Sequence, residues 1–264
     1  MTDITLNDGR TMPALGMGTY KIPDSQAATV VRAGLDTGFR LVDTAAFYHN
    51  ERGVGEGVHG SEAFVTTKLW NDRHDDAEAA LDESLALLGV DAVDLYLIHW
   101  PVPSQGRFVA AWKYLVRLRE AGKAKSIGVS NFLARHLERA IDATGVMPAV
   151  NQIELHPRFQ QVELRGWMEE NGIVTQSWSP LGQGEVLGDP AIVEIARKHG
   201  RSPAQVVIAW HLALGLSVIP KAGSPAHLAE NAAAADLTLD DDDLAAIAAL
   251  DSQDGRIGPE PMSM

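Results

Sequence analysis

The sequence predicts a (β/α)8 TIM barrel, an α/β fold, with an N-terminal β-hairpin ahead of the first barrel strand. Eight short apolar runs are spaced along the chain with helix-like segments between them, which is the repeat of such a barrel. The runs cover residues 14–17, 41–42, 64–67, 93–98, 126–129, 148–150, 173–175 and 216–219. The length of 264 residues suits this fold, so we expect a single barrel domain over residues 1–264.

The elements at the two ends are indicated by turn and breaker residues. Asp8-Gly9 lies between two short extended segments and predicts the hairpin, which we expect to close the bottom of the barrel. Past Leu250, several glycines and prolines predict an irregular tail that lies over the barrel mouth.

The helices between the strands have their own signals. Apolar residues recur at helical spacing in Ala77, Leu81 and Leu85 and predict one face that packs on the sheet. Ser202 predicts a capped helix start, because Gln205 stands where it can complete a capping box.

Composition narrows the classes of protein. No apolar stretch reaches the roughly 18–20 residues of a membrane span, and a net charge of −13 disfavours nucleic acid as a partner. The chain has no cysteine and no signal-peptide pattern at its start. We therefore expect a soluble, cytoplasmic monomer whose partner is a small molecule.

The C-terminal ends of successive runs carry chemically useful side chains. Asp43, Lys68 and His99 follow the second, third and fourth runs, and strand ends of a barrel converge on one mouth. A buried salt bridge and a structural core histidine are the alternatives when each signal is taken alone. Their placement at three neighbouring strand ends favours a catalytic site.

Motifs along essentially the full chain resemble those of the aldo-keto reductase family. They are DTAAFYHNE at 43–51, TKLW at 67–70, IHWP at 98–101, GVSNF at 128–132, NQIELHP at 151–157, SWSPLG at 177–182 and VIPK at 218–221. Within the family the chain is most similar to the bacterial 2,5-diketo-D-gluconic acid reductases. The resemblance implies an NADPH- or NADH-dependent oxidoreductase that reduces aldehydes, ketones or keto sugars.

The resemblance also implies a catalytic tetrad of Asp43, Tyr48, Lys68 and His99. Reducing a carbonyl requires a proton at oxygen, and Tyr48 can supply it. The Lys68 ammonium favours the phenolate and so lowers the pKa of Tyr48, while Asp43 holds Lys68 charged. His99 can donate a hydrogen bond to the carbonyl oxygen.

Two further sets of residues follow from the resemblance. Cofactor contacts are implied for Thr19, Tyr20, Ser130, Asn131, Gln152, Trp178, Ser179, Leu181, Gly182, Lys221, Ser224, His227, Glu230 and Asn231. Trp178 would stack on the nicotinamide, and Glu185 would pair with Lys221. Substrate contacts are expected from the aromatic groups that adjoin the tetrad, Tyr20, Phe47, Trp70 and Trp100, and from His99 of the tetrad itself.

One part of the family pattern is altered. At the adenosine 2′-phosphate site, Ala222 replaces a serine and His227 replaces an arginine, although Ser224 can offer a hydroxyl. Neutral histidine lacks the fixed charge and planar fork of arginine, so the preference for NADPH over NADH should be weakened.

Three alternatives are less well supported. No complete G-x-G-x-x-G motif indicates a Rossmann domain, and His49 with Glu51 lacks a third ligand, so we expect no metal. The remaining alternative is a nicotinamide-binding regulatory subunit on the same barrel, which the intact tetrad disfavours.

Overall fold

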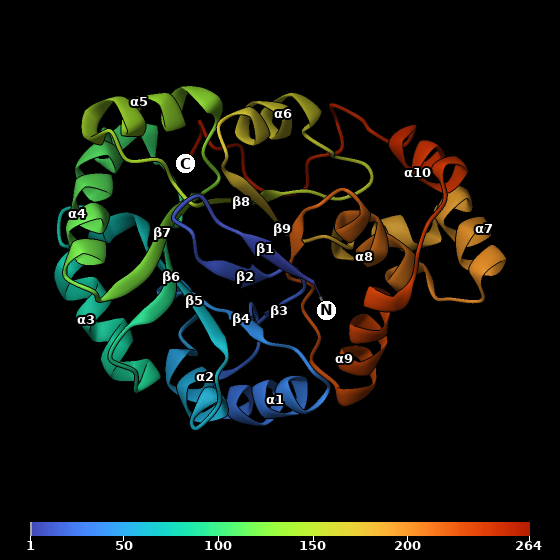
Figure 1. Ribbon diagram of the computed structural model, residues 1–264, viewed down its shortest axis with the longest axis horizontal. Helices are drawn as coiled ribbons and strands as arrows, with labels where there is room; N and C mark the ends of the chain where they lie inside the picture. The colour runs from blue at the N-terminus through green and yellow to red at the C-terminus, as the bar shows by residue number, and fades with distance from the viewer. Residues whose placement is uncertain (1) are drawn as a thin grey trace.

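Eight parallel strands form a barrel that a ring of helices surrounds (Figure 1). The computed structural model describes residues 2–264. The barrel strands are β3 (Met17–Gly18), β4 (Leu41–Asp43), β5 (Phe64–Leu69), β6 (Val93–Ile98), β7 (Ala124–Ser130), β8 (Val150–Glu154), β9 (Val174–Trp178) and β10 (Ser217–Val218). They pair in chain order, and parallel bridges from Leu15 to Val218 and from Gly18 to Lys221 close the ring.

The helices follow the strands around the outside of the barrel. They are α1 (Asp24–Asp36), α2 (Glu51–Val58), α3 (Ala77–Leu88), α4 (Phe108–Glu120), α5 (Ala134–Thr144), α6 (Val162–Glu170), α7 (Pro190–His199), α8 (Pro203–Ala213), α9 (Pro225–Ala232) and α10 (Asp241–Ala248). Short 3-10 turns are η1 (Ala46–Tyr48), η2 (Asn71–Arg73), η3 (Pro103–Gln105), η4 (Gly182–Gly188) and η5 (Ala233–Asp236). The predicted barrel fold is confirmed.

The N-terminal hairpin lies across the centre of the barrel in Figure 1 and joins β1 (Asp3–Thr5) to β2 (Thr11–Pro13). Gly9 supplies the positive φ of 84° that its turn requires. Leu6 and Met12 are buried with interior residues of the barrel, and the Asn7 amide donates to the carbonyl of Pro148 just before β8. The hairpin therefore closes the bottom, as the sequence predicts.

Helix packing follows the sequence signals closely. Ala77, Leu81 and Leu85 of α3 are buried against the sheet. Ser202 accepts from the backbone of Gln205, whose side chain returns to Ser202, so the predicted capping box is present.

The strands extend beyond the apolar runs. The sequence predicts a strand at 148–150, whereas β8 begins at Val150 and continues through Asn151 and Gln152 to Glu154. These polar residues can occupy a strand because their side chains find hydrogen-bond partners inside the protein. Polar residues that we expected just after the strands are thus held rigidly within them.

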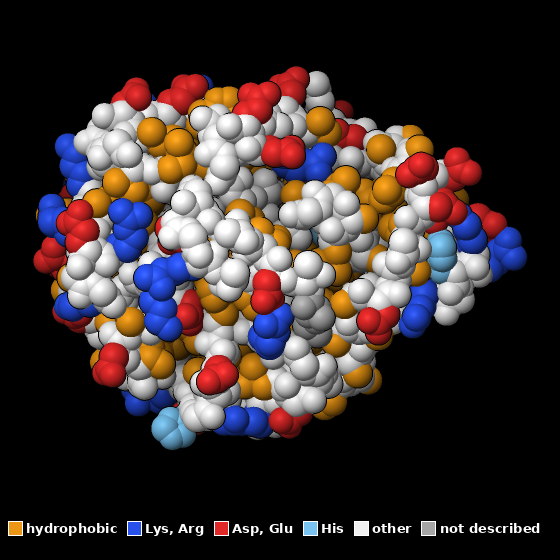
Figure 2. Space-filling model, in the orientation of Figure 1, with side chains coloured by type: hydrophobic (Ala, Val, Ile, Leu, Met, Phe, Trp, Pro, Cys, Tyr) orange, Lys and Arg blue, Asp and Glu red, His pale blue; other side chains and the backbone are white. Residues whose placement is uncertain are grey.

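Two surface properties bear on possible partners. Across residues 2–264, no helix combines the length and apolar character that crossing a membrane takes. On the face shown in Figure 2, Lys and Arg side chains are interspersed with Asp and Glu side chains. The absence of a nucleic-acid partner stays a prediction.

Candidate active site

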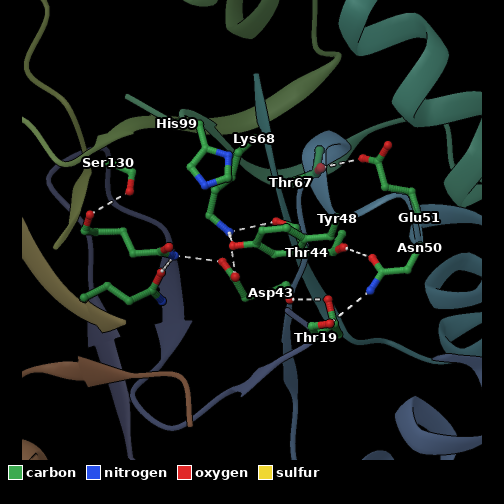
Figure 3. A network of polar contacts seen from close by, with 12 residues as sticks. Thr19, Asp43, Thr44, Tyr48, Asn50, Glu51, Thr67, Lys68, His99 and Ser130 are labelled. Carbon is green, nitrogen blue, oxygen red and sulfur yellow. Dashed lines mark hydrogen bonds and ion pairs between the residues drawn. The ribbon is translucent and has the colours of Figure 1, made fainter. Parts of the chain in front are cut away.

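The four tetrad residues meet at the C-terminal mouth of the barrel (Figure 3). Asp43 ends β4, Lys68 lies on β5, His99 follows β6, and Tyr48 ends η1. Asp43, Tyr48 and His99 line a cavity of about 520 Å³, and Lys68 contacts the first two of these residues. A volume of this size suits a small-molecule site.

A buried ion pair is the centre of this group. Lys68 Nζ lies 2.6 Å from Asp43 Oδ1, and it also donates to the carbonyl of Thr44 at 2.8 Å. The same ammonium is 3.4 Å from the hydroxyl of Tyr48. Burial lowers the pKa of Lys68 and raises that of Asp43, while the attraction between the two charges opposes both changes. The short distance from Lys68 Nζ to Asp43 identifies an ion pair, and one N–H of Lys68 points at the hydroxyl of Tyr48.

The pKa of Tyr48 differs from the sequence-based expectation. Lys68 was expected to lower it, but burial, and then the negative charge of Asp43, raise the pKa of Tyr48 well above its usual value. The reason is that Asp43 offsets the charge of Lys68 in a site where burial disfavours phenolate. The phenol consequently keeps its proton at neutral pH, which is the form a proton donor needs.

His99 is neutral for a similar reason. Burial, and then the positive charge of Lys68, hold the pKa of His99 well below its usual value. Its Nδ1 atom is buried without a hydrogen-bond partner among residues 2–264. Unpartnered buried polar atoms are uncommon and often mark functional sites.

The pKa shifts of His99 and Tyr48 predict a rate of reduction that changes little with pH. The lowered pKa of His99 keeps the ring neutral on both sides of pH 6.5, and the raised pKa of Tyr48 keeps the phenol protonated beyond pH 10. We expect kcat/KM to stay within about twofold between pH 6 and 8. Steady-state rates measured across this interval test it, and an inflection near 6.5 would contradict the neutral His99.

A network of amides and hydroxyls adjoins the ion pair. Gln152 Nε2 donates to Asp43 Oδ2 at 2.8 Å and to Gln176 at 2.6 Å. The hydroxyl of Ser130 donates to the carbonyl of Gln152, and Asn131 donates to the carbonyl of His99. The predicted cofactor residues on β7 and β8 thus lie together, next to the catalytic candidates.

Aromatic side chains form much of the cavity wall. Phe47 and Trp70 stack with ring centroids 3.8 Å apart, and Trp70 meets His99 edge to face at 5.0 Å. Trp100 lies across from Trp178 at 6.5 Å. Tyr20, the remaining predicted substrate residue, also lines this cavity, so all five are brought together.

Four wall residues share a left-handed backbone conformation. Lys21, Asn131, Ser179 and Gln183 have positive φ values between 48° and 64° and line the cavity. Such backbone strain concentrates at functional sites. Lys21 and Gln183 were not predicted. The tail lies at the mouth as predicted, although its cavity-lining residues were not named in advance.

Other predicted cofactor residues lie away from the cavity wall. The side chain of Thr19 is fully buried, and its hydroxyl donates to the carbonyl of Asp43 at 2.9 Å. The Thr19 hydroxyl therefore supports β4, and its contact with the cofactor stays a prediction. Leu181 packs against the core, and Gly182 lines a separate cavity with Glu185. Within residues 2–264 no ion pair joins Glu185 to Lys221, in contrast to our expectation.

The predicted 2′-phosphate residues lie on α9 and in the segment just before it. Ser224 caps this helix by accepting from the backbone of His227, which is exposed. Glu230 and Asn231 belong to the same helix. Lys221 precedes it and lines the cavity, so it connects the two regions.

Metal ligation has no evident site. Among residues 2–264, no three His, Asp or Glu side chains are grouped so that they could hold an ion. That the protein uses no metal stays a prediction.

Comparisons with known proteins show the family of the chain. A family model described as the aldo/keto reductase family matches residues 13–252. Methylglyoxal reductase DkgA of Escherichia coli is 48% identical over 98% of this chain and 97% of its own length. An aldo-keto reductase of Mycolicibacterium smegmatis is also 48% identical, over 98% of this chain and 96% of its own.

Solved structures give the same result. The structure of a Gox0644 variant in complex with NADPH is 53% identical, with a TM-score of 0.97 over 98% of this chain and 97% of that one. With relatives this similar over nearly its whole length, the chain belongs to the aldo/keto reductase family of oxidoreductase enzymes.

Proposed function

We propose that the protein reduces small aldehydes and ketones to alcohols with NADPH or NADH, and that α-dicarbonyl compounds such as methylglyoxal are among its substrates. The observation that carries the proposal is the Asp43–Lys68 ion pair beside the protonated Tyr48 in an aromatic cavity. The relatives named methylglyoxal reductases support the substrate class, and the NADPH complex of Gox0644 supports the cofactor. Keto sugars are a second candidate class.

The residues present suit a nicotinamide cofactor. Trp178 offers a flat ring, and Ser130, Asn131 and Gln152 offer amide and hydroxyl groups in the same cavity. Lys221 adds a positive charge that suits a phosphate. When bound, the cofactor supplies the hydride that the carbonyl carbon accepts.

The chain's own residues perform the remaining steps. Tyr48 gives its proton to the carbonyl oxygen, and neutral His99 can donate one hydrogen bond to the same oxygen. The phenolate that forms lies 3.4 Å from the Lys68 ammonium, which stabilises it. Lys68 thus stabilises the phenolate as Tyr48 gives up its proton. Before that step the raised pKa keeps Tyr48 protonated.

Product analysis tests the proposal directly. Protein, cofactor and methylglyoxal are incubated with a chelator, and the products are identified by NMR. We expect one carbonyl reduced to an alcohol for each cofactor oxidised, with no effect of the chelator. Cofactor binding without any alcohol from a panel of carbonyl compounds would favour the regulatory alternative.

Cofactor preference gives a second test. The buried Ala222 and the helix-capping Ser224 leave few groups for a 2′-phosphate, so the kcat/KM ratio of NADPH over NADH should be below about 100. His227→Arg should raise that ratio about ten- to a hundredfold through KM for NADPH. The matched control is His59→Arg, an exposed histidine just past α2. An equal ratio in wild type and His227→Arg would show that His227 does not face the phosphate.

Three further properties stay predictions: a single domain, a monomeric state and a cytoplasmic location. Light scattering on the purified protein tests the second.

A further inference from the structure

We propose that Glu154 is a positioning residue that fixes the C-terminal tail, residues 251–264, as a wall of the active-site cavity and thereby sets which carbonyl compounds enter. The proposal rests on the proposed carbonyl reduction. Glu154 ends β8 and is 1% exposed, so its carboxylate is buried. A buried carboxylate is costly unless hydrogen bonds satisfy it.

The tail supplies those hydrogen bonds. The backbone N–H groups of Ile257 and Gly258 donate to the two different oxygens of Glu154, at 2.7 and 2.8 Å. His156 Nε2 lies 3.2 Å from one of them. Although burial opposes the shift, these contacts hold the pKa of Glu154 below its usual value. The carboxylate is therefore ionised at neutral pH and binds two consecutive amides of the tail.

Glycine at position 258 brings the tail against a cavity residue. A Cβ on Gly258 would lie 2.4 Å from Cη2 of Trp178 and 2.7 Å from Glu154 Oε2. Only glycine lets the backbone approach this closely. Trp178 is the register partner of Glu154 on β9, and its indole N–H donates to Asn131 at 2.8 Å. The position of the tail is thus coupled to the ring that we assign to the nicotinamide.

The tail is held at both ends of its path. The backbone N–H of Ser252 donates to the carbonyl of Arg158 at 3.1 Å, and the Ser104 hydroxyl donates to the carbonyl of Met264 at 3.2 Å. The tail therefore crosses the mouth from the loop after β8 to η3. It contains no helix or strand, so its order depends on such contacts.

The tail faces the cavity with mainly apolar groups. Ile257, Gly258, Pro259 and Met264 all line the cavity. If the Glu154 contacts are lost, a small carbonyl compound loses this wall, whereas a bulky one gains space. Glu154 touches no tetrad residue, and Trp178 keeps its hydrogen bond to Asn131, so the effect should appear chiefly in KM and change kcat much less.

Glu154→Gln tests the role of the Glu154 carboxylate in holding the tail, because it removes the charge with little change of shape. Glu163→Gln, an exposed glutamate on α6, is the matched control. In Glu154→Gln, hydrogen exchange of peptides from 251–264 should rise about ten- to a hundredfold. KM for methylglyoxal should rise about tenfold with kcat changed less than about threefold, and kcat/KM should shift in favour of a bulky aryl ketone.

Gly258→Ala provides an independent route, because it displaces the tail while Glu154 is intact, and it decides the matter if Glu154→Gln does not fold. It should reproduce both the faster exchange and the KM effect. Unchanged exchange in these variants, or faster exchange without a change in KM for either substrate, would overturn the proposal. Hydrogen exchange of the tail can be measured without turnover. If the wild-type protein reduces no carbonyl compound, the proposed function is refuted, while the exchange rates still decide whether Glu154 fixes the tail.

Discussion

Tyr48→Phe should lower kcat for carbonyl reduction by about 10² to 10⁴, the range that a positioned proton donor contributes. The substitution removes only the phenol oxygen, which lies 3.4 Å from Lys68 Nζ at the cavity wall. Because the ring is kept, the dissociation constant for NADPH should change less than about twofold. Absorbance at 340 nm gives the rate, and quenching of tryptophan fluorescence gives the affinity.

Tyr20→Phe is the matched control for this variant. The rings of Tyr20 and Tyr48 are 5.0 Å apart, so the same group is removed from the same cavity. No contact to Lys68 is lost in the control, so any fall in kcat should be far smaller than in Tyr48→Phe. Tyr48→Phe with more than about a tenth of the wild-type kcat would contradict the assignment. A loss confined to Tyr20→Phe would transfer the role to that residue.

Lys68→Met should lower both turnover and stability. It deletes the ammonium that stabilises the Tyr48 phenolate, for a loss in kcat of about tenfold or more. It also leaves the Asp43 carboxylate, 2% exposed, without its cationic partner. Breaking a buried ion pair from one side costs about 3–5 kcal/mol of unfolding free energy. Chemical denaturation and steady-state kinetics measure the two effects.

The double variant Asp43→Asn with Lys68→Met separates these effects. Removing both charges should restore much of the unfolding free energy, because no unpaired charge is left buried. Turnover should stay low, since the phenolate still lacks its cation. If the double variant recovers turnover as well as unfolding free energy, the ion pair serves stability alone. A fully active Lys68→Met single variant would also contradict the catalytic role of Lys68.

The barrel and the meeting of the tetrad could be predicted because both depend on local patterns. Apolar runs at regular spacing define the strands, and strand direction alone brings Asp43, Lys68 and His99 to one mouth. The hairpin was predictable from its Asp8-Gly9 turn.

Properties that depend on distant contacts could not be predicted. The raised pKa of Tyr48 results from burial and from the charge of Asp43, which no spacing in the chain reveals. The Glu154 contacts join residues about a hundred positions apart through backbone N–H groups, which carry no sequence signal. Thr19 was expected to contact the cofactor from the resemblance alone, which did not reveal that its buried hydroxyl donates to the carbonyl of Asp43.

The most direct test of the account is the rate of NADPH oxidation at 340 nm by the purified wild-type protein, with and without methylglyoxal, beside Tyr48→Phe. Oxidation should require the carbonyl compound, be insensitive to a chelator and fall about 10²-fold or more in the variant. Carbonyl-dependent oxidation that is equal in both proteins, or absent from the wild type with a panel of carbonyl compounds and both cofactors, would contradict it.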